Sequence, residues 1–306
     1  MSHSPPPDLA IDPRHVALQF ERRQPWRDAA FLHQEIADRM LERLTYIRLA
    51  PAALLDAGCG AGAALAGLRG RYPEAVYHGV DQSSRALAAA REAYRSRPGG
   101  WRRWLGREPA QPEFRFLEGD LARTPLPDES VDLVWSNLAL HWHPRPHQVF
   151  AEWFRILRPQ GLVMFSTYGP ATLREVRAAV VDAGLTTTTL PLVDMHDFGD
   201  LLLENGFADP VMDQETLTLT YSDGAELLAD VRRLGGNPTR GRRPGLAGRG
   251  FRQRLLDALE AQRGADGQLR LTLEVAYGHA WRANARRHGQ ETLIPVSAIS
   301  RRRDTD

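Results

Sequence analysis

Hydrophobic positions along the first half of the chain alternate between two patterns. Short apolar runs, which are typical of buried strands, recur at 52–57, 76–81, 114–120, 131–137 and 161–167. Segments with the apolar period of a helix lie at 31–49, 84–95 and 149–157. Strands and helices that alternate at this spacing predict an α/β fold, with a doubly wound, mostly parallel sheet and helices on both of its faces.

The second half is less regular but shows both patterns. Helical periods occur at 172–184, 195–207, 225–235 and 251–262, and strand patterns at 211–221 and 269–283. The first twelve residues are rich in proline and serine and are predicted to be disordered. Residues 96–112 interrupt the alternation with proline, glycine, arginine and two tryptophans, which predicts an exposed insertion, and 286–306 form a polar tail.

Composition excludes several kinds of chemistry. All 39 basic residues are arginine, which excludes a lysine Schiff base and a P-loop lysine. The single cysteine, Cys59, permits neither an intrachain disulfide nor a cysteine metal cluster. The net charge is +1, no apolar stretch is long enough to span a membrane, and the start shows no secretory signal. We expect a cytoplasmic protein that binds no metal, membrane or nucleic acid.

A glycine-rich turn follows the first strand directly, in the sequence LLDAGCGAG at 54–62. Gly58, Gly60 and Gly62 allow the backbone to approach a ligand, and the start of the next helix offers free N–H groups. Gly58, Gly60 and Ala63 also satisfy the loose pattern of dinucleotide-binding proteins. A dehydrogenase and a purely structural turn are therefore both open alternatives at this point.

Polar residues stand at the ends of the successive strands. Asp56 lies just before the glycines, Asp81 ends the second strand, Asp120 ends the third, and Asn137 follows the fourth. The carboxyl ends of parallel strands share one edge of a sheet, where open α/β folds bind ligands. A carboxylate such as Asp81 can accept hydrogen bonds from both ribose hydroxyls. One such acid is usually a helix cap or a turn residue, but together they predict a nucleoside site.

At these positions the sequence resembles the class I S-adenosylmethionine-dependent methyltransferases. The resemblance rests on D-x-G-C-G-x-G at 56–62, G-V-D at 79–81 and G-D-L at 119–121. It implies a Rossmann-like sheet of seven strands with S-adenosyl-L-methionine as cofactor. The glycine turn would face the methionine part of the cofactor. Asp81 would hold the ribose, Asp120 and Leu121 would flank the adenine, and Asn137 would lie beside the methionine end. The full set of cofactor-binding residues that the resemblance implies is Asp56, Gly58, Gly60, Gly62, Asp81, Gln82, Asp120, Leu121 and Asn137.

The same resemblance divides the chain. It implies one domain over 31–285, with a cofactor-binding half at about 50–168, a substrate-facing insertion at about 169–265 and a final strand at about 269–283. Residues 1–30 would supply a disordered segment and a helical lid.

Segments beyond this core resemble a narrower family, the malonyl-[acyl-carrier protein] O-methyltransferases of biotin synthesis. They lie at 136–142, 169–177, 194–221 and 227–237. One departure is that Phe20 is not followed by the tyrosine that this family usually carries in its N-terminal helix. The same segments also resemble a mitochondrial complex I assembly factor, an arginine hydroxylase with the methyltransferase fold. That protein is the alternative, and it implies no methyl transfer.

The malonyl reading determines which catalytic groups to expect. A malonyl carboxylate is already ionised at neutral pH, so it needs a group that orients it rather than a general base. His141 and Trp142 just past the fourth strand, and Arg174 in the following helical segment, are the catalytic candidates. The alternatives are a buried structural histidine at His141 and a solvated helix face at Arg174.

Arginines cluster near the C-terminal end of the insertion. Residues 232–254 contain no acid and eight arginines, namely Arg232, Arg233, Arg240, Arg242, Arg243, Arg249, Arg252 and Arg254. Such a segment suits an acidic acyl carrier protein and the phosphodiester of its prosthetic arm. A flexible basic loop is the plain alternative. RNA binding is a third, but no interleaved aromatic residues accompany the arginines.

Overall fold

The structure is a computed structural model that describes residues 8–23, 30–95, 113–242 and 248–283. These residues form a seven-stranded sheet in the order β3-β2-β1-β4-β5-β7-β6, in which β7 is antiparallel to both of its neighbours. The strands are β1 Ala53–Ala57, β2 Val76–Asp81, β3 Phe114–Glu118, β4 Val131–Ser136, β5 Leu157–Tyr168, β6 Phe207–Tyr221 and β7 Leu269–Arg282. The predicted doubly wound α/β fold is confirmed.

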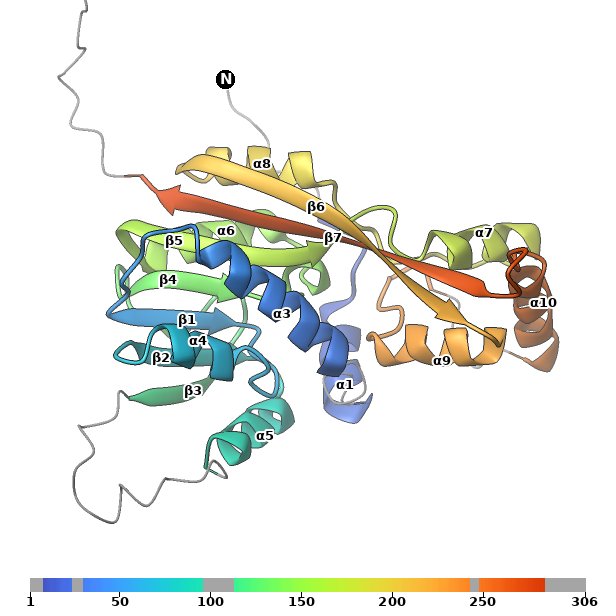
Figure 1. Ribbon diagram of the computed structural model, residues 1–306, viewed down its shortest axis with the longest axis horizontal. Coiled ribbons are helices and arrows are strands. Elements are labelled where there is room, and N and C mark those ends of the chain that lie inside the picture. Colours follow the sequence, from blue (N-terminus) through green and yellow to red (C-terminus); the bar gives the residue numbers. More distant parts are fainter. Residues whose placement is uncertain (1–7, 24–29, 96–112, 243–247, 284–306) are drawn as a thin grey trace, which may run out of the picture.

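Helices cover both faces of the sheet (Figure 1). They are α1 Pro13–Arg23, α3 Ala30–Leu44, α4 Leu65–Arg71, α5 Ser84–Arg95, α6 Pro146–Ile156, α7 Arg174–Asp182, α8 Met195–Glu204, α9 Gly224–Arg233 and α10 Arg249–Glu260, with a 3-10 turn, η1, at Leu140–Trp142. Buried residues of α3 and α4 pack in one apolar cluster and those of α6 and α8 in another. Every residue of β1 is buried between these layers, which explains its uninterrupted apolar run.

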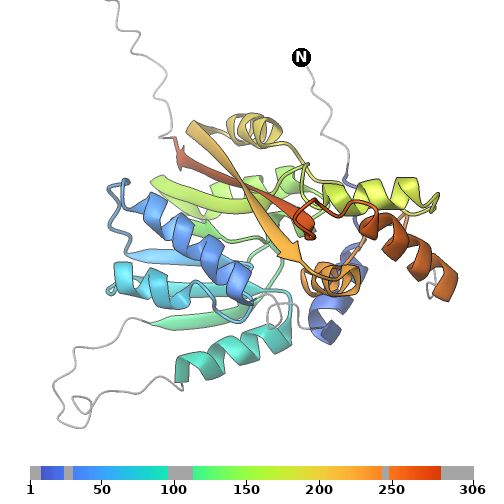
Figure 2. The same cartoon turned by 45° about the vertical axis from the view of Figure 1, so that its right-hand side comes forward.

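The last two strands extend well beyond the other five (Figure 1). At their far ends, α7, α9 and α10 gather around a third apolar cluster that includes Leu227, Leu259 and Leu271. The turned view in Figure 2 shows α1 lying beside α9, between this lobe and the rest of the sheet. α1 and the lobe therefore lie beyond the carboxyl ends of β1, β2 and β4.

Two strands begin four residues earlier than the hydrophobic pattern predicts. β5 begins at Leu157 rather than 161, and its early part contains Gln160 with a positive φ of 65°. β6 begins at Phe207 rather than 211, and its pairing with β7 shifts register between Ala208 and Val211. These irregular positions interrupt the alternation of apolar residues, so the pattern identifies only the later part of each strand.

The N-terminal segment differs from the prediction of disorder over the first twelve residues. Ile11 is fully buried and forms an antiparallel bridge with Thr239, and the Arg240 amide donates to the carbonyl of Ala10. Residues 8–12 are therefore fixed to the loop after α9, because a buried side chain and backbone hydrogen bonds hold them. Residues 1–7, the 96–112 insertion and the 286–306 tail lie outside the described residues.

Candidate functional site

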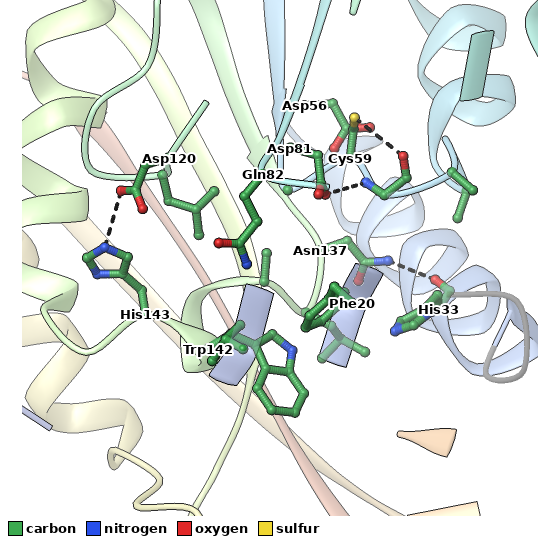
Figure 3. A pocket seen from close by; sticks show the side chains of 18 of the residues that line it. Phe20, His33, Asp56, Cys59, Asp81, Gln82, Asp120, Asn137, Trp142 and His143 are labelled. Carbon is green, nitrogen blue, oxygen red and sulfur yellow. Dashed lines mark hydrogen bonds and ion pairs between the residues drawn. The ribbon is translucent and has the colours of Figure 1, made fainter. Parts of the chain in front are cut away.

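The predicted cofactor residues come together in one pocket at the carboxyl ends of β1, β2 and β4 (Figure 3). Those that line it are Asp56, Gly58, Gly60, Asp81, Gln82, Asp120, Leu121 and Asn137. Gly62 is the exception, since it completes the turn without lining the pocket. Eight of the nine predicted residues therefore line one cavity, as their positions at the strand ends led us to expect.

The turn after β1 owes its shape to its glycines. Gly58, Gly60 and Gly62 have positive φ angles of 75°, 52° and 82°. A Cβ atom on Gly58 would lie 2.4 Å from the Cβ of Ala139, so no larger residue fits between the turn and the segment before η1. The amide of Gly60 donates a 2.9 Å hydrogen bond to the carboxylate of Asp81, which joins the turn to the end of β2.

Two carboxylates lie deep in this pocket. Asp81 accepts hydrogen bonds from the amides of Gly60 and Ser83, at 2.9 Å and 2.8 Å, while burial raises its pKa. Asp56 accepts a 2.6 Å hydrogen bond from the Tyr77 hydroxyl, and burial raises the pKa of Asp56 to about 7. Burial without a paired cation disfavours the charged form of both groups. A cationic or hydroxyl-bearing ligand would relieve that cost.

The charge of the pocket supports the predicted cofactor over a dinucleotide. Asp56, Asp81 and Asp120 line it, and no arginine is found among its described lining residues. S-adenosylmethionine carries a sulfonium, an ammonium and two ribose hydroxyls, all of which suit carboxylates. A dinucleotide would instead bring its anionic pyrophosphate to three acids. The residues present therefore fit S-adenosylmethionine.

Asp120 has a partner that the sequence argument missed. The Nδ1 atom of His143 accepts a hydrogen bond from the Arg145 amide at 3.1 Å, so the ring proton belongs on Nε2. Nε2 lies 3.3 Å from a carboxylate oxygen of Asp120, and this hydrogen bond is the main cause that lowers the Asp120 pKa (Figure 3). Position in the sequence suggests only a turn at His143, because Pro144 follows it.

The N-terminal helices complete the pocket. Pro13, Val16 and Phe20 of α1 line it, and the Phe20 ring meets the Trp142 ring edge-on at 5.5 Å between centroids. Figure 3 shows this aromatic pair across the pocket from Asp56 and Asp81. α1 therefore forms one wall of the pocket.

Contacts at both sides hold these helices in place. Glu21 of α1 accepts a 3.0 Å hydrogen bond from the Ser83 hydroxyl beside α5. The Asn137 amide donates a 2.8 Å hydrogen bond to the carbonyl of His33 in α3, and the Asn137 oxygen accepts one from the Ser166 hydroxyl. Asn137 thus joins α3 to β4 and β5 beside the pocket.

The structure separates the three predicted catalytic residues. Trp142 lines the cofactor pocket and also a second pocket beside it. His141 is only 4% exposed and lines neither, because its ring lies against those of Trp142 and Tyr168. Neither ring nitrogen of His141 has a hydrogen-bond partner among the described residues, and burial lowers its pKa to about 3. His141 is thus a neutral, buried support behind Trp142.

Arg174 lies away from both pockets. Its side chain is 64% exposed and pairs with Glu175. On α7 and the residue before it, the face toward the second pocket carries Leu173, Val176, Arg177 and Val180, which recur at helical spacing. Arg174 is turned by about 100° from Leu173 on the helix, which takes it off this face. The structure therefore brings Arg177, and not Arg174, to the pocket.

The second pocket is larger, with a volume of about 540 Å³, and it lies within the lobe of α7, α9 and α10. Trp142 and Leu234 belong to the walls of both pockets. Two members of the arginine-rich segment, Arg232 and Arg252, line the second pocket. Other members are engaged elsewhere, since Arg233 pairs with Asp230 and Arg242 lies 3.8 Å from Asp12. Arg243 lies outside the described residues.

Comparison with known proteins identifies the family. Residues 55–165 match a family described as Methyltransferase domain. A malonyl-[acyl-carrier protein] O-methyltransferase of Nitrosospira multiformis is 42% identical over 279 residues, with 90% of this chain and 91% of the relative covered. The protein of the same name from Laribacter hongkongensis is 44% identical over 277 residues, with the same coverage. The chain belongs to the malonyl-[acyl-carrier protein] O-methyltransferase family.

Membership of this family confirms the resemblance stated from the sequence motifs. The YcgJ protein of Bacillus subtilis is 16% identical, with a TM-score of 0.55, and covers 82% of this chain and 99% of its own, so it shows the shared fold. Neither the relatives nor the fold favours the assembly-factor alternative. No described helix is long and apolar enough to cross a membrane, and the described residues contain no group of side chains arranged to hold a metal.

Proposed function

We propose that this protein transfers the methyl group of S-adenosylmethionine to the free carboxylate of a malonyl group on acyl carrier protein. The observation that carries the proposal is a pair of adjoining pockets of opposite charge, which meet at Trp142 and Leu234. One is acidic and suits the cationic cofactor, and the other is basic and suits an anionic acceptor. The names of the close relatives support the same reaction.

S-adenosylmethionine supplies a methyl group that is already activated by its bond to a sulfonium. When the cofactor is bound, Asp81 would accept hydrogen bonds from the ribose hydroxyls, and Asp56 would attract the ammonium of the methionine part. Asp120, which His143 holds in place, would accept a hydrogen bond from the adenine amino group. Each of these residues binds or orients, and none exchanges a proton with the reacting atoms.

The acceptor likewise needs no base. A carboxylate oxygen forms a bond to the methyl carbon while the carbon–sulfur bond breaks, and its electron pair goes to sulfur. The products are a methyl ester and S-adenosylhomocysteine, and no proton moves. Catalysis then depends on alignment, which Trp142 supports as a wall shared by both ligands. The position of His141 outside both pockets agrees with a reaction that needs no base.

We also propose that the acidic carrier protein docks on the exposed arginines of α10, in the cytoplasm. Arg249 and Arg254 are exposed on that helix, and Arg249 lies one turn before the pocket-lining Arg252. Reversing Arg249 and Arg254 to glutamate should raise KM for malonyl-carrier protein and weaken its dependence on salt. Turnover at saturating carrier should stay within about twofold of the original, because the reacting groups are untouched. An unchanged KM at both low and high salt would reject this docking site.

The experiment that tests the function uses purified protein, S-adenosylmethionine and malonyl-carrier protein. We expect S-adenosylhomocysteine and malonyl methyl ester in equal amounts, measured by mass spectrometry of the carrier. Acetyl-carrier protein is the matched control, since it has the same arm but no free carboxylate. Equal product from both carriers, or none from the malonyl form, would contradict the proposal.

A further inference from the structure

The lining of the second pocket has an unusual distribution of charge. Three arginines, Arg177, Arg232 and Arg252, line it, and its described lining residues include no acid. Most of the remaining wall is apolar, with leucines and valines from α7, α9 and α10, while Thr187, Thr188, Thr189 and Asn237 add polar atoms. Its volume of about 540 Å³ lies within the ~300–1,000 Å³ range of ligand sites.

The Arg177 side chain, which lines this pocket, contacts the segment that follows β5. Its guanidinium donates to the carbonyls of Pro170 and Thr172, which follow closely on Tyr168 at the end of β5. The Tyr168 ring in turn contacts His141, the neighbour of the shared wall residue Trp142. Carbonyl contacts orient the Arg177 guanidinium and leave its charge without a carboxylate partner among the described residues.

Two carboxylates near Arg177 have partners of their own. Glu175 accepts hydrogen bonds from the amide and hydroxyl of Thr272, and it pairs with Arg174. Glu274 accepts a 2.9 Å hydrogen bond from the amide of Ala171. Both raise the pKa of Arg177, but burial outweighs them and lowers it. A half-buried cation of this kind is stabilised by an anionic ligand.

Arg232 and Arg252 differ from Arg177 because they are exposed. Arg252 belongs to α10, the helix that lies farthest from the cofactor-binding strands in Figure 1. The apolar side chains of Leu228, Val231 and Leu255 also line this lobe. The second pocket thus has a half-buried cation, Arg177, an apolar wall, and an exposed cation, Arg252, on the helix farthest from the cofactor-binding strands.

We infer that the second pocket binds the acyl-phosphopantetheine arm of the carrier, with Arg177 on the malonyl carboxylate and Arg252 on the phosphate. This inference rests on the proposed function. Charge complementarity at two separated points sets the direction of the arm, with the carboxylate toward Trp142 and the cofactor. The hydrocarbon and amide portions of the arm match the apolar wall and its few polar side chains.

The test compares malonyl-phosphopantetheine with malonyl-pantetheine, which lacks the phosphate. Both are titrated by calorimetry into the protein saturated with S-adenosylhomocysteine, so that the readout is independent of turnover. Arg252→Met should weaken the phosphorylated ligand by ~10-fold, the low end for a charge-assisted hydrogen bond at an exposed site, and leave the other unchanged. Arg270→Met is the matched control, an exposed arginine outside both pockets that should change neither affinity.

Arg177 is tested with the same ligands. Arg177→Met should weaken both by ~30-fold or more, since both carry the carboxylate, and Arg177→Lys should recover part of that loss. Both variants should retain the original affinity for S-adenosylhomocysteine and the original melting temperature. A fall in either would indicate that the loop at 170–172 has loosened, rather than that only the ligand contact is lost.

Failure of this inference differs from failure of the proposed function. If Arg252→Met and Arg177→Met leave both ligands at their original affinities, or if Arg252→Met weakens both equally, the assignment of the pocket is wrong. The original protein could still methylate malonyl-carrier protein in that case. Conversely, selective loss of the phosphorylated ligand in Arg252→Met supports the assignment even if no methyl ester forms.

Discussion

The two pockets share Trp142 and Leu234 but are built from opposite charges. The first is lined by three carboxylates and no arginine, and the second by three arginines and no carboxylate, among the described residues. This contrast follows the chemistry proposed for the ligands, a cationic methyl donor and an anionic acceptor. Opposite fields favour each ligand in its own pocket and direct the reacting groups toward the shared wall.

The largest loss of affinity confined to one pocket should follow from a change in the glycine turn of the first pocket. Gly60 has a positive φ of 52°, which a β-branched side chain adopts only with strain, and its amide holds Asp81. We expect Gly60→Val to abolish binding of S-adenosylhomocysteine in calorimetry. Malonyl-phosphopantetheine should still bind, because the second pocket does not contain this turn. Normal cofactor affinity in this variant would show that the turn is only structural.

A smaller but still large effect is expected at Asp81. Alanine removes acceptors for two ribose hydroxyls, and a hydrogen bond to a charged group contributes about 1.5–3 kcal/mol. We therefore expect Asp81→Ala to weaken S-adenosylhomocysteine by about 100-fold or more. Asp182→Ala serves as the control, since this exposed aspartate of α7 lines neither pocket. Unchanged affinity in Asp81→Ala would show that the end of β2 does not bind the cofactor.

The charge of Asp56 makes cofactor binding depend on pH. With a pKa of about 7, Asp56 loses most of its charge between pH 8 and pH 6, so affinity for S-adenosylhomocysteine should fall by about tenfold. Asp56→Asn should remove this dependence and bind weakly at both pH values. If the affinity of Asp56→Asn depends on pH just as steeply, another group causes the pH dependence.

The same pKa has a consequence for stability. The folded protein retains the Asp56 proton up to about pH 7, whereas the unfolded chain releases it near its ordinary pKa of 3.8. The ligand-free protein therefore loses stability from this group as pH rises across that window, and the loss is complete above it. Asp56→Asn should accordingly raise the melting temperature of the ligand-free protein at pH 8.

The smallest effect is expected at His143, which positions Asp120. The Asp120 carboxylate also accepts a hydrogen bond from the Ala122 amide, so His143→Phe should weaken S-adenosylhomocysteine by only about threefold. The preference for S-adenosylhomocysteine over S-inosylhomocysteine should fall with it. His143→Gln keeps a donor and should preserve that preference. An unaltered preference in His143→Phe would leave His143 with a packing role alone.

The first pocket could be predicted closely from the sequence. Its residues stand at the ends of consecutive strands, and the parallel order brings Asp81 and Asp120 to one edge regardless of side-chain detail. Phe20 and His33 escaped prediction because nothing in the sequence tells where the N-terminal helices lie against that edge. His143 escaped because its partnership with Asp120 depends on the course of the chain after η1.

The second pocket could not be predicted in the same way. Its walls come from residues between Trp142 and Leu273, and only the packing of the lobe brings them together. Arg174 was the expected carboxylate-binding residue, yet Leu173, Val176 and Val180 already mark an apolar face to which Arg177 belongs. Helical spacing within α7 therefore carried the signal that selects Arg177, although the pocket itself did not show in the sequence.

One set of binding measurements tests the opposition of the two pockets most directly. S-adenosylhomocysteine and malonyl-phosphopantetheine are each titrated into the original protein, Asp81→Ala and Arg252→Met. Each variant should lose affinity only for its own ligand, Asp81→Ala for S-adenosylhomocysteine and Arg252→Met for malonyl-phosphopantetheine. Equal weakening of both ligands by either variant would contradict the assignment of one ligand to each pocket.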